Sequence, residues 1–222
     1  MHQATLDLQK AMQKMKKSYR EYYILKMDVR KFFNSIDKKI LYKILKKRIK
    51  DEKLLWLIRQ ILSAQERQKG IEIGNYTSQT FANIYLNELD QYATRKLKIK
   101  NYYRYMDDIV ILARNKNEAK EYLNEIKEFL QKKLELNDKT NIFKAKQGVN
   151  FCGYKINEYR LKVRNKGKNK FKKKVKNLLK EIKEGNISSK DARQYLTGHL
   201  GYFEIANTYN LKQKNIFLQD EL

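Results

Sequence analysis

An acidic turn joins two apolar segments within residues 102–113 of this chain. The run Tyr105-Met106-Asp107-Asp108 is followed at once by Ile109-Val110-Ile111-Leu112, which leaves no room for a long connection. Two strands joined so tightly form an antiparallel hairpin. The chain must therefore build an antiparallel sheet, and that sheet must present carboxylates at one of its turns.

The other segments supply a further strand and several helices. Residues 22–28 alternate, with Tyr23, Leu25 and Met27 on one side and Lys26 and Asp28 on the other, as in a strand that buries one face. Apolar side chains recur every three or four residues in six other segments, which predicts helices there. These segments are 37–49, 51–62, 78–92, 118–136, 171–184 and 190–207, with Ser78 as the expected cap of the third. Short strands are expected at 141–144 and 150–156, joined by a turn at Gln147-Gly148. We expect an α+β fold in which the helices at 37–49 and 51–62 lie on the sheet.

The charge of the chain indicates a polyanionic partner. The 222 residues carry 50 Lys and Arg against 25 Asp and Glu, a formal charge of +25. Lysine-rich coding drift would scatter this excess, yet residues 160–180 hold 11 Lys or Arg and no acid. A nucleic acid would neutralise such a run.

Several classes of protein are disfavoured by the composition. The apolar runs are too short for a membrane span, and no signal peptide is recognisable. Cys152 has no second cysteine to pair with, and His2 and His199 are too few for a Cys/His zinc site. We expect a reduced, cytoplasmic protein.

Three aspartates each stand at the end of a strand. If the strand that ends at Asp28 pairs with the hairpin, Asp28 and Asp107 project from neighbouring strands, with Asp108 adjacent. Carboxylates so close suit Mg²⁺, and a pair of such ions can catalyse phosphoryl transfer. The structural alternative is that Asp-Asp is ordinary turn chemistry and that Asp28 caps a neighbouring segment.

Five motifs together resemble those of reverse transcriptases, in the family's order and over more than half of the chain. Tyr105-Met106-Asp107-Asp108 resembles the YxDD box, and residues 27–37 (MDVRKFFNSID) are similar to the first palm motif. Residues 70–79 (GIEIGNYTSQ) resemble the loop and helix beneath the incoming nucleotide. Residues 136–140 (LNDKT) resemble the lysine motif, and residues 151–154 (FCGY) the primer-grip hairpin.

The resemblance implies a polymerase-type palm with an antiparallel sheet packed on helices, followed by a small helical thumb. It divides the chain into an N-terminal helical segment (1–20), the palm (21–158) and a basic thumb (159–222). It also implies an RNA-directed DNA polymerase with two Mg²⁺ ions held by Asp28, Asp107 and Asp108, together with the carbonyl of Val29. The partners implied are an RNA template, a DNA primer or cDNA, and deoxynucleoside triphosphates.

The same resemblance assigns residues around the nucleotide and the primer. Phe33 would exclude a ribose 2′-hydroxyl, although a phenylalanine there also suits the core, and Gly74 would let the backbone approach the nucleotide. Lys139 would protonate the leaving pyrophosphate or be one more solvated lysine. The residues expected at the primer and template are Tyr105, Met106, Ser78, Gln79, Phe151, Gly153, Tyr154, Lys168 and Lys172.

Residues 73–79 (IGNYTSQ) fit the pattern of diversity-generating retroelement enzymes rather than the QGxxxSP of intron-type enzymes. Resemblance to that subgroup implies errors opposite template adenines and a basic accessory protein. Ile73 stands where intron-type enzymes have glutamine. We interpret Ile73 either as a residue that reduces the fidelity of copying, because it offers no hydrogen bond, or as an ordinary buried isoleucine.

Two departures from the family pattern bear on activity. Only 27 residues precede Asp28, so we expect the fingers region of the family to be missing, and we interpret the chain as a truncated reading frame or a fragment. Glu72 and Asp138 each stand where proline is usual. The alternatives left open are an intron-like, CRISPR-associated or phage-defence reverse transcriptase, and a non-catalytic RNA-binding palm.

Overall fold

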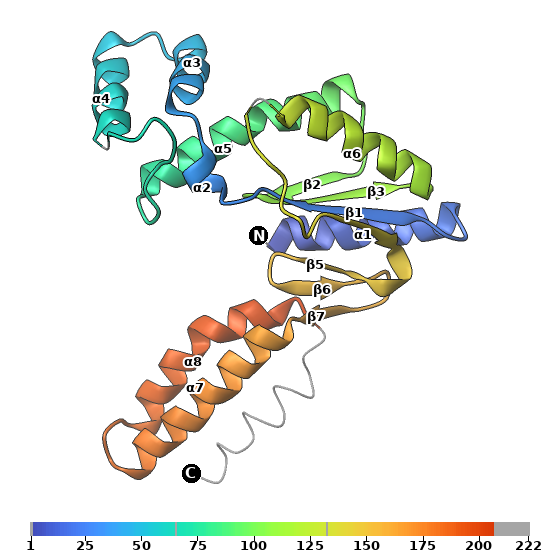
Figure 1. Cartoon of the computed structure of the whole chain (residues 1–222). Helices are drawn as coiled ribbons and strands as arrows, with labels where there is room; N and C mark the ends of the chain where they lie inside the picture. Colours follow the sequence, from blue (N-terminus) through green and yellow to red (C-terminus); the bar gives the residue numbers. More distant parts are fainter. Residues whose placement is uncertain (1, 65, 132, 207–222) are drawn as a thin grey trace. The chain divides into compact units, whose positions relative to one another are not determined.

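A computed structural model of the chain describes residues 2–64, 66–131 and 133–206 (Figure 1). The chain divides into two compact units. One is Tyr19–Lys144, and the other combines the described residues of Met1–Ser18 and Ala145–Leu222. Each unit is described by itself, and the three-part division expected from the sequence stays a prediction. No helix in the described part of the chain is both long and apolar enough to cross a membrane.

The unit Tyr19–Lys144 contains a four-stranded antiparallel sheet in the order β2-β3-β1-β4. Its elements in chain order are β1 (Tyr23–Asp28), α2 (Phe32–Ser35), α3 (Lys38–Arg48), α4 (Glu52–Ser63), α5 (Tyr76–Gln91), the π-helical turn η1 (Tyr92–Lys96), β2 (Tyr102–Tyr105), β3 (Asp108–Ala113), α6 (Lys116–Leu130) and β4 (Asn141–Lys144). The hairpin and the central strand β1 are therefore confirmed.

The sheet buries one face against helices α5 and α6 (Figure 1). Leu25 and Met27 of β1 join Ile109 and Ile111 of β3 in this core, and all four are fully buried. Because side chains alternate along a strand, Lys26 and Asp28 of β1 point to the opposite face. The alternation in the sequence thus sets which face of the sheet carries the charged groups.

Helices α3 and α4 do not lie on the sheet, so that expectation is wrong. Helix α3 packs against α5, and α4 packs against α3 (Figure 1). Helix α4 turns Leu55, Ile58 and Leu62 inward but leaves Trp56 and Leu57 61% and 48% exposed. The wide apolar arc of α4 is therefore only partly buried within this unit, because α3 covers one side of it.

Helix ends follow local capping chemistry. The side chains of Asp37, Asp51 and Asn115 accept backbone N–H groups at the starts of α3, α4 and α6. Helix α5 begins at Tyr76 after Asn75, so Ser78 lies buried inside its first turn and is not the expected cap. Helix α6 ends at Leu130, short of the expected residue 136.

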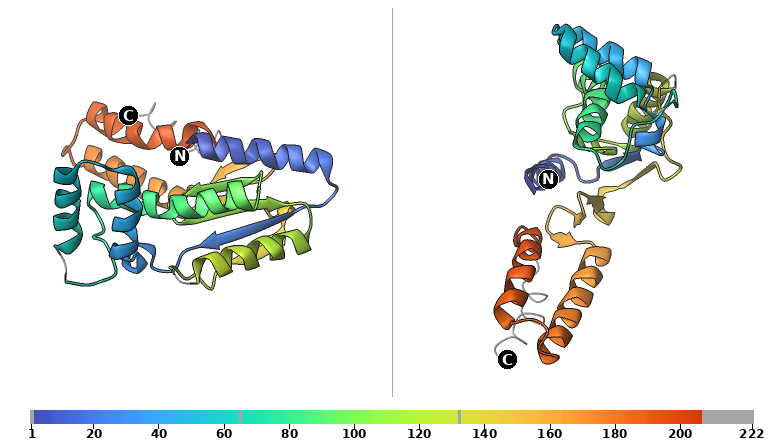
Figure 2. Two further views of the ribbon diagram at one scale, coloured as in Figure 1. Left: turned by 90° about the horizontal axis from the view of Figure 1, so that it is seen from above. Right: turned by 90° about the vertical axis from the view of Figure 1, so that its left-hand side faces the viewer.

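The second unit holds a three-stranded antiparallel sheet and two long helices. Its elements are α1 (His2–Ser18), the 3-10 turn η2 (Ala145–Gln147), β5 (Val149–Phe151), β6 (Tyr154–Ile156), β7 (Leu161–Val163), α7 (Asn165–Lys183) and α8 (Ser189–Glu204). Helices α7 and α8 lie side by side (Figure 2), with the rings of Phe171 and Phe203 4.7 Å apart between centroids.

Two features of this second unit differ from expectation. Strand β7 lies within the basic run and was not expected. Its apolar and basic residues alternate over only three positions, which is too few to indicate a strand. The turn at Gln147-Gly148 does not join a hairpin, because β4 pairs with β1 and β5 pairs with β6. The predicted α+β architecture of an antiparallel sheet packed on helices, followed by a helical segment, is otherwise confirmed.

Candidate metal centre

Asp28 and Asp108 lie directly opposite each other on neighbouring strands. The antiparallel register of β1 and β3 pairs Asp28 with Asp108 and Met27 with Ile109. Residues paired in this way share a face of the sheet. Both carboxylates therefore point to the face opposite α5 and α6, and both are half-buried.

Asp107 completes an acidic cluster from the turn between β2 and β3. The turn consists of Met106 and Asp107, because Tyr105 already pairs with Asp108. Met106 adopts a left-handed conformation (φ 56°), which non-glycine residues rarely do outside tight turns. The strand register and the turn thus place the three aspartates that the sequence singled out at the same end of β1 and β3.

The electrostatics of Asp28 reflect this crowding. Burial raises the pKa of its carboxyl above the usual value, and the nearby charge of Asp107 raises it further. Lys26, Lys139 and a hydrogen bond from Asn137 act in the opposite direction but do not outweigh these two effects. The raised pKa means that the folded protein disfavours the ionised form of Asp28, which a bound cation would favour.

Two residues that sequence reasoning missed hold the cluster in place. Lys26 forms an ion pair with Asp108 across the two strands. Asn137 donates its backbone N–H to the Asp28 carbonyl at 2.7 Å and its Nδ2 to Asp28 Oδ2 at 3.3 Å. The position of Lys26 could be predicted from the sequence, because it lies two residues before Asp28 and so on the same face of the strand. The contact of Asn137 with Asp28 could not, because more than a hundred residues separate the two in the sequence.

Val29 follows Asp28 and forms an isolated antiparallel bridge with Leu136. The bridge is made by hydrogen bonds from Arg30 N to Glu135 O and from Asn137 N to Asp28 O. Neither of these bonds uses the carbonyl of Val29, which is consistent with its predicted role as a ligand. The role itself stays a prediction.

The donor set suits a hard divalent cation. Carboxylate and carbonyl oxygens are the ligands that Mg²⁺ prefers, and Asp28, Asp107, Asp108 and Val29 offer both kinds. Within the described residues, no three or more His, Cys, Asp or Glu side chains are placed so that together they could hold a metal ion. Lys26 pairs with Oδ1 of Asp108, so an ion held by Asp108 would share this carboxylate with Lys26 or displace it.

The residues predicted at the nucleotide lie on α2 and on the loop before α5. Phe33 is half-buried against Phe32, which is the core member of the pair at 3% exposure. The loop is tied to α2 by hydrogen bonds from Gly70 N to Ile36 O and from Ile71 N to Phe33 O. These bonds bring the nucleotide loop to the same end of β1 that carries Asp28.

Ile73 and Gly74 occupy the exposed tip of this loop. Ile73 is 74% exposed, so the alternative that it is a plain buried isoleucine is wrong. Gly74 has φ 109°, a conformation that side chains disfavour, and a Cβ there would meet nothing within 4 Å. Within this unit, the backbone conformation explains why glycine stands at position 74, whereas a close neighbouring atom does not.

Lys139 and the residues beside the turn are accessible. Lys139 is exposed, and its charge lowers the pKa of Asp28, so it lies near the cluster. Tyr105 is 42% exposed, and Met106 is half-buried. On α5, Ser78 is buried while Gln79 is exposed, so Gln79 is the better placed of the two for a ligand.

The remaining predicted residues belong to the second unit. Phe151 and Tyr154 are almost fully buried there, and the turn between them places Cys152 and Gly153 at positive φ. On α7, Lys168 is half-buried and Lys172 is exposed. The predicted primer grip would therefore act through the backbone of its turn, because its rings fill the core of their own unit.

The sequence is similar to those of known proteins. A sequence profile described as "Reverse transcriptase (RNA-dependent DNA polymerase)" matches residues 1–156. The Putative COX1/OXI3 intron 2 protein of Saccharomyces cerevisiae is 25% identical over 209 aligned positions, which cover 63% of this chain and 24% of that protein.

Solved structures of telomerase share the fold. The Candida tropicalis enzyme in complex with a TWJ fragment of telomeric RNA gives a TM-score of 0.58 at 14% identity, covering 96% of this chain and 42% of that one. The Candida albicans enzyme with the same kind of fragment gives 0.56 at 13% identity, covering 72% and 34%. The chain thus spans less than half the length of each of these relatives.

Proposed function

This chain belongs to the reverse transcriptase family, and we propose from this that it is an RNA-directed DNA polymerase. The reaction would add deoxynucleotides to a DNA primer on an RNA template by two-metal-ion phosphoryl transfer. The observation that carries the proposal is the cluster itself. Asp28 faces Asp108 across β1 and β3, and Asp107 stands close enough to raise the pKa of Asp28.

Each residue of the site has a proposed task. Asp28 and Asp107, with Asp108 and the Val29 carbonyl, would hold two Mg²⁺ ions, which when bound activate the attacking hydroxyl and stabilise the leaving oxygen. Phe33 would exclude ribonucleotides by contact with the 2′-hydroxyl. Lys139 would donate a proton to the pyrophosphate that leaves.

Primer extension on an RNA template tests the proposal. The chain should extend the primer only with a divalent cation, and Asp107→Asn should lose the product while still binding the hybrid. Glu128→Gln, which removes one charge from the exposed side of α6, serves as the control and should extend normally. Hybrid binding without any extension by the wild type would favour a non-catalytic RNA-binding palm instead.

Within the family, we propose that the chain is an enzyme of the diversity-generating retroelement type, acting with a basic accessory protein. The support is the sequence Ile73–Gln79 together with the exposure of Ile73 at the loop tip, where an aliphatic side chain offers no hydrogen bond. An intron-type enzyme is the second candidate, favoured by the similarity to the yeast intron protein.

The error spectrum separates these two candidates. The retroelement assignment predicts misincorporation concentrated opposite template adenines, and Ile73→Gln should reduce it. Errors spread evenly over the four template bases would favour the intron type. An upstream pair of imperfect repeats that differ at adenines would give independent support for the first.

A further inference from the structure

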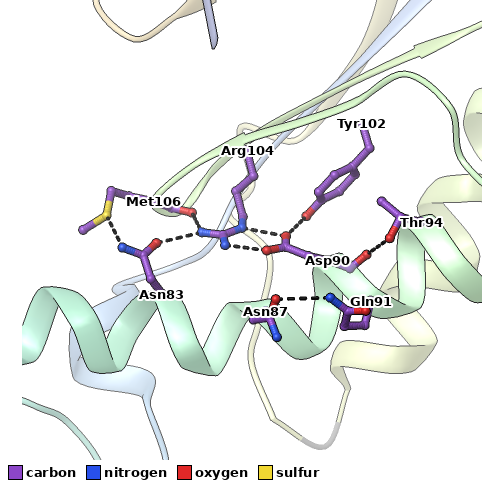
Figure 3. Close-up of polar contacts among 8 residues, drawn as sticks. All are labelled: Asn83, Asn87, Asp90, Gln91, Thr94, Tyr102, Arg104 and Met106. Atoms are coloured by element: carbon purple, nitrogen blue, oxygen red, sulfur yellow. Dashed lines mark hydrogen bonds and ion pairs between the residues drawn. The ribbon is translucent and has the colours of Figure 1, made fainter. Parts of the chain in front are cut away.

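A partly buried ion pair joins helix α5 to the strand that leads into the acidic turn (Figure 3). Arg104 of β2 donates from Nε to Asp90 Oδ1 at 2.7 Å and from Nη2 to Asp90 Oδ2 at 2.5 Å. Tyr102 donates its hydroxyl to the same Asp90 Oδ1 at 2.8 Å. The side chains of Arg104 and Asp90 are only 12% and 22% exposed, so the pair is well shielded from water.

The strand register explains why Arg104 reaches the helix. Tyr102 pairs with Ile111 and Arg104 pairs with Ile109, and these isoleucines face the core beneath α5. Tyr105 pairs with Asp108 and so belongs to the other face. Strand β2 therefore places its polar anchors under α5, while its last residue stands beside the carboxylates.

The electrostatics keep the Arg104 guanidinium and the Tyr102 hydroxyl protonated. Burial alone would lower the pKa of the Arg104 guanidinium, but the hydrogen bonds and charge of Asp90 outweigh it and raise the pKa above the usual value. Burial and the Asp90 carboxylate raise the pKa of Tyr102 well above its usual range. Tyr102 therefore remains a hydrogen-bond donor to Asp90 at any working pH.

The remaining donors of Arg104 extend this anchor to the turn. Its Nη1 donates to the carbonyl of Met106 and to Asn83 Oδ1, both at 3.0 Å. Asn83, also on α5, contacts Met106 Sδ through its Nδ2 at 3.4 Å (Figure 3). Met106 holds the left-handed conformation that forms the turn and directly precedes Asp107.

We propose that Arg104, anchored by Asp90, is a positioning residue that fixes the Met106-Asp107 turn and thereby the Asp107 carboxylate. The proposal rests on the proposed polymerase function. Arg104 itself lies on the opposite face of the sheet from the carboxylates and acts on them only through the Met106 carbonyl. It also links the turn to α5, the helix that begins at the nucleotide loop.

The geometry requires arginine at this position. Arg104 uses four of its five N–H groups, directed at two oxygens of Asp90, one of Asn83 and one of Met106. A lysine could satisfy Asp90 as a point charge, but it could not also reach the turn with a planar fork. Arg104→Lys should therefore restore more of the folding stability than of the catalytic rate.

Steady-state primer extension with a Mg²⁺ titration tests the proposal. We expect Arg104→Ala to lower kcat about 10- to 100-fold, since displacement of a catalytic group by about 1 Å costs of that order. The half-saturating Mg²⁺ concentration should rise several-fold, and binding of a primer–template hybrid without divalent metal should stay unchanged. Arg104→Lys should fold, with a smaller loss of kcat, a smaller rise in the half-saturating Mg²⁺ concentration and unchanged hybrid binding.

Arg114→Ala provides a matched control. Arg114 follows the far end of β3 and pairs with Glu118 of α6 at 2.7 Å, with no contact to the turn. It should keep the wild-type kcat and Mg²⁺ requirement, even if its melting temperature falls.

The outcomes separate this proposal from the proposed function. A wild-type chain that fails to extend any primer would remove the polymerase assignment itself. If the wild type extends but Arg104→Lys keeps both the wild-type kcat and the wild-type Mg²⁺ requirement, the positioning role is wrong. An Arg114→Ala variant with the same loss as Arg104→Ala would also overturn it, because the effect would then be general destabilisation.

Discussion

Replacement of Asp28 by asparagine should make the metal-free protein more stable. The variant removes a negative charge that faces Asp108 across the strands and lies near Asp107, while an amide of the same shape can still accept the hydrogen bond from Asn137. Like charges at opposed strand positions cost up to about 1 kcal/mol. The site is half-exposed and Lys26 offsets part of the repulsion, so we expect a gain of about 0.5–1 kcal/mol.

Mg²⁺ should reverse this order. At 100 times the dissociation constant, binding stabilises the wild type by about 2.7 kcal/mol. If the loss of one ligand weakens binding tenfold, the variant gains only about 1.4 kcal/mol at the same concentration. The difference of about 1.3 kcal/mol exceeds the advantage of the metal-free variant, so the wild type becomes the more stable protein.

The pH dependence has a definite sign. The pKa of Asp28 is raised in the folded state, so the folded protein binds its proton more tightly than the unfolded chain does. The destabilisation is therefore complete above the folded pKa and is relieved as the pH falls toward 3.8, the ordinary value. Without metal, the gap between Asp28→Asn and the wild type should close over that window.

Hydrogen exchange of the β1 amides at residues 23–28 measures these free energies locally, where the substitution acts. Glu128→Gln is the control, because it removes one exposed charge from α6 and should respond to neither Mg²⁺ nor this pH window. The reasoning fails if Asp28→Asn is less stable than the wild type without metal, or if Mg²⁺ stabilises both proteins equally.

Two further predictions concern the nucleotide and the nucleic acid. Phe33→Val should increase incorporation of ribonucleotides relative to deoxynucleotides by about 10- to 100-fold, measured as the ratio of kcat/KM values; an unchanged ratio would remove Phe33 from sugar selection. Replacing Lys168 and Lys172 of α7 by alanine should lower the slope of log K against log salt for hybrid binding by about 2, since each phosphate contact contributes about 0.9. An unchanged slope would place the nucleic acid elsewhere.

The elements whose pattern is local were predictable from the sequence. The tight hairpin follows from apolar runs on both sides of Met106-Asp107, and the face on which Asp28 points follows from the alternation of β1. The proximity of the three aspartates needed one further step, namely that β1 pairs with β3. Resemblance of the motifs to reverse transcriptases supplied the reason to expect that pairing.

Contacts between distant segments were not predictable in the same way. The apolar arc of α4 predicts a surface that faces the core. Trp56 is nevertheless mostly exposed, because α4 packs on α3 and not on the sheet. The pairing of Arg104 with Asp90 depends on the register of β2 under α5, which the composition of neither segment reveals. The local signal was an arginine among the tyrosines of a strand whose residues are mostly half-buried.

Binding of Mn²⁺ followed by electron paramagnetic resonance tests the central claim most directly, because Mn²⁺ takes the same oxygen ligands as Mg²⁺. If Asp28 and Asp107 hold the same ions, Asp28→Asn and Asp107→Asn should each lower the affinity for Mn²⁺. The double variant should then bind Mn²⁺ only slightly more weakly than the single variant that binds it less tightly. Wild-type Mn²⁺ binding by both single variants, or losses that simply add, would show that the two carboxylates do not share a metal centre.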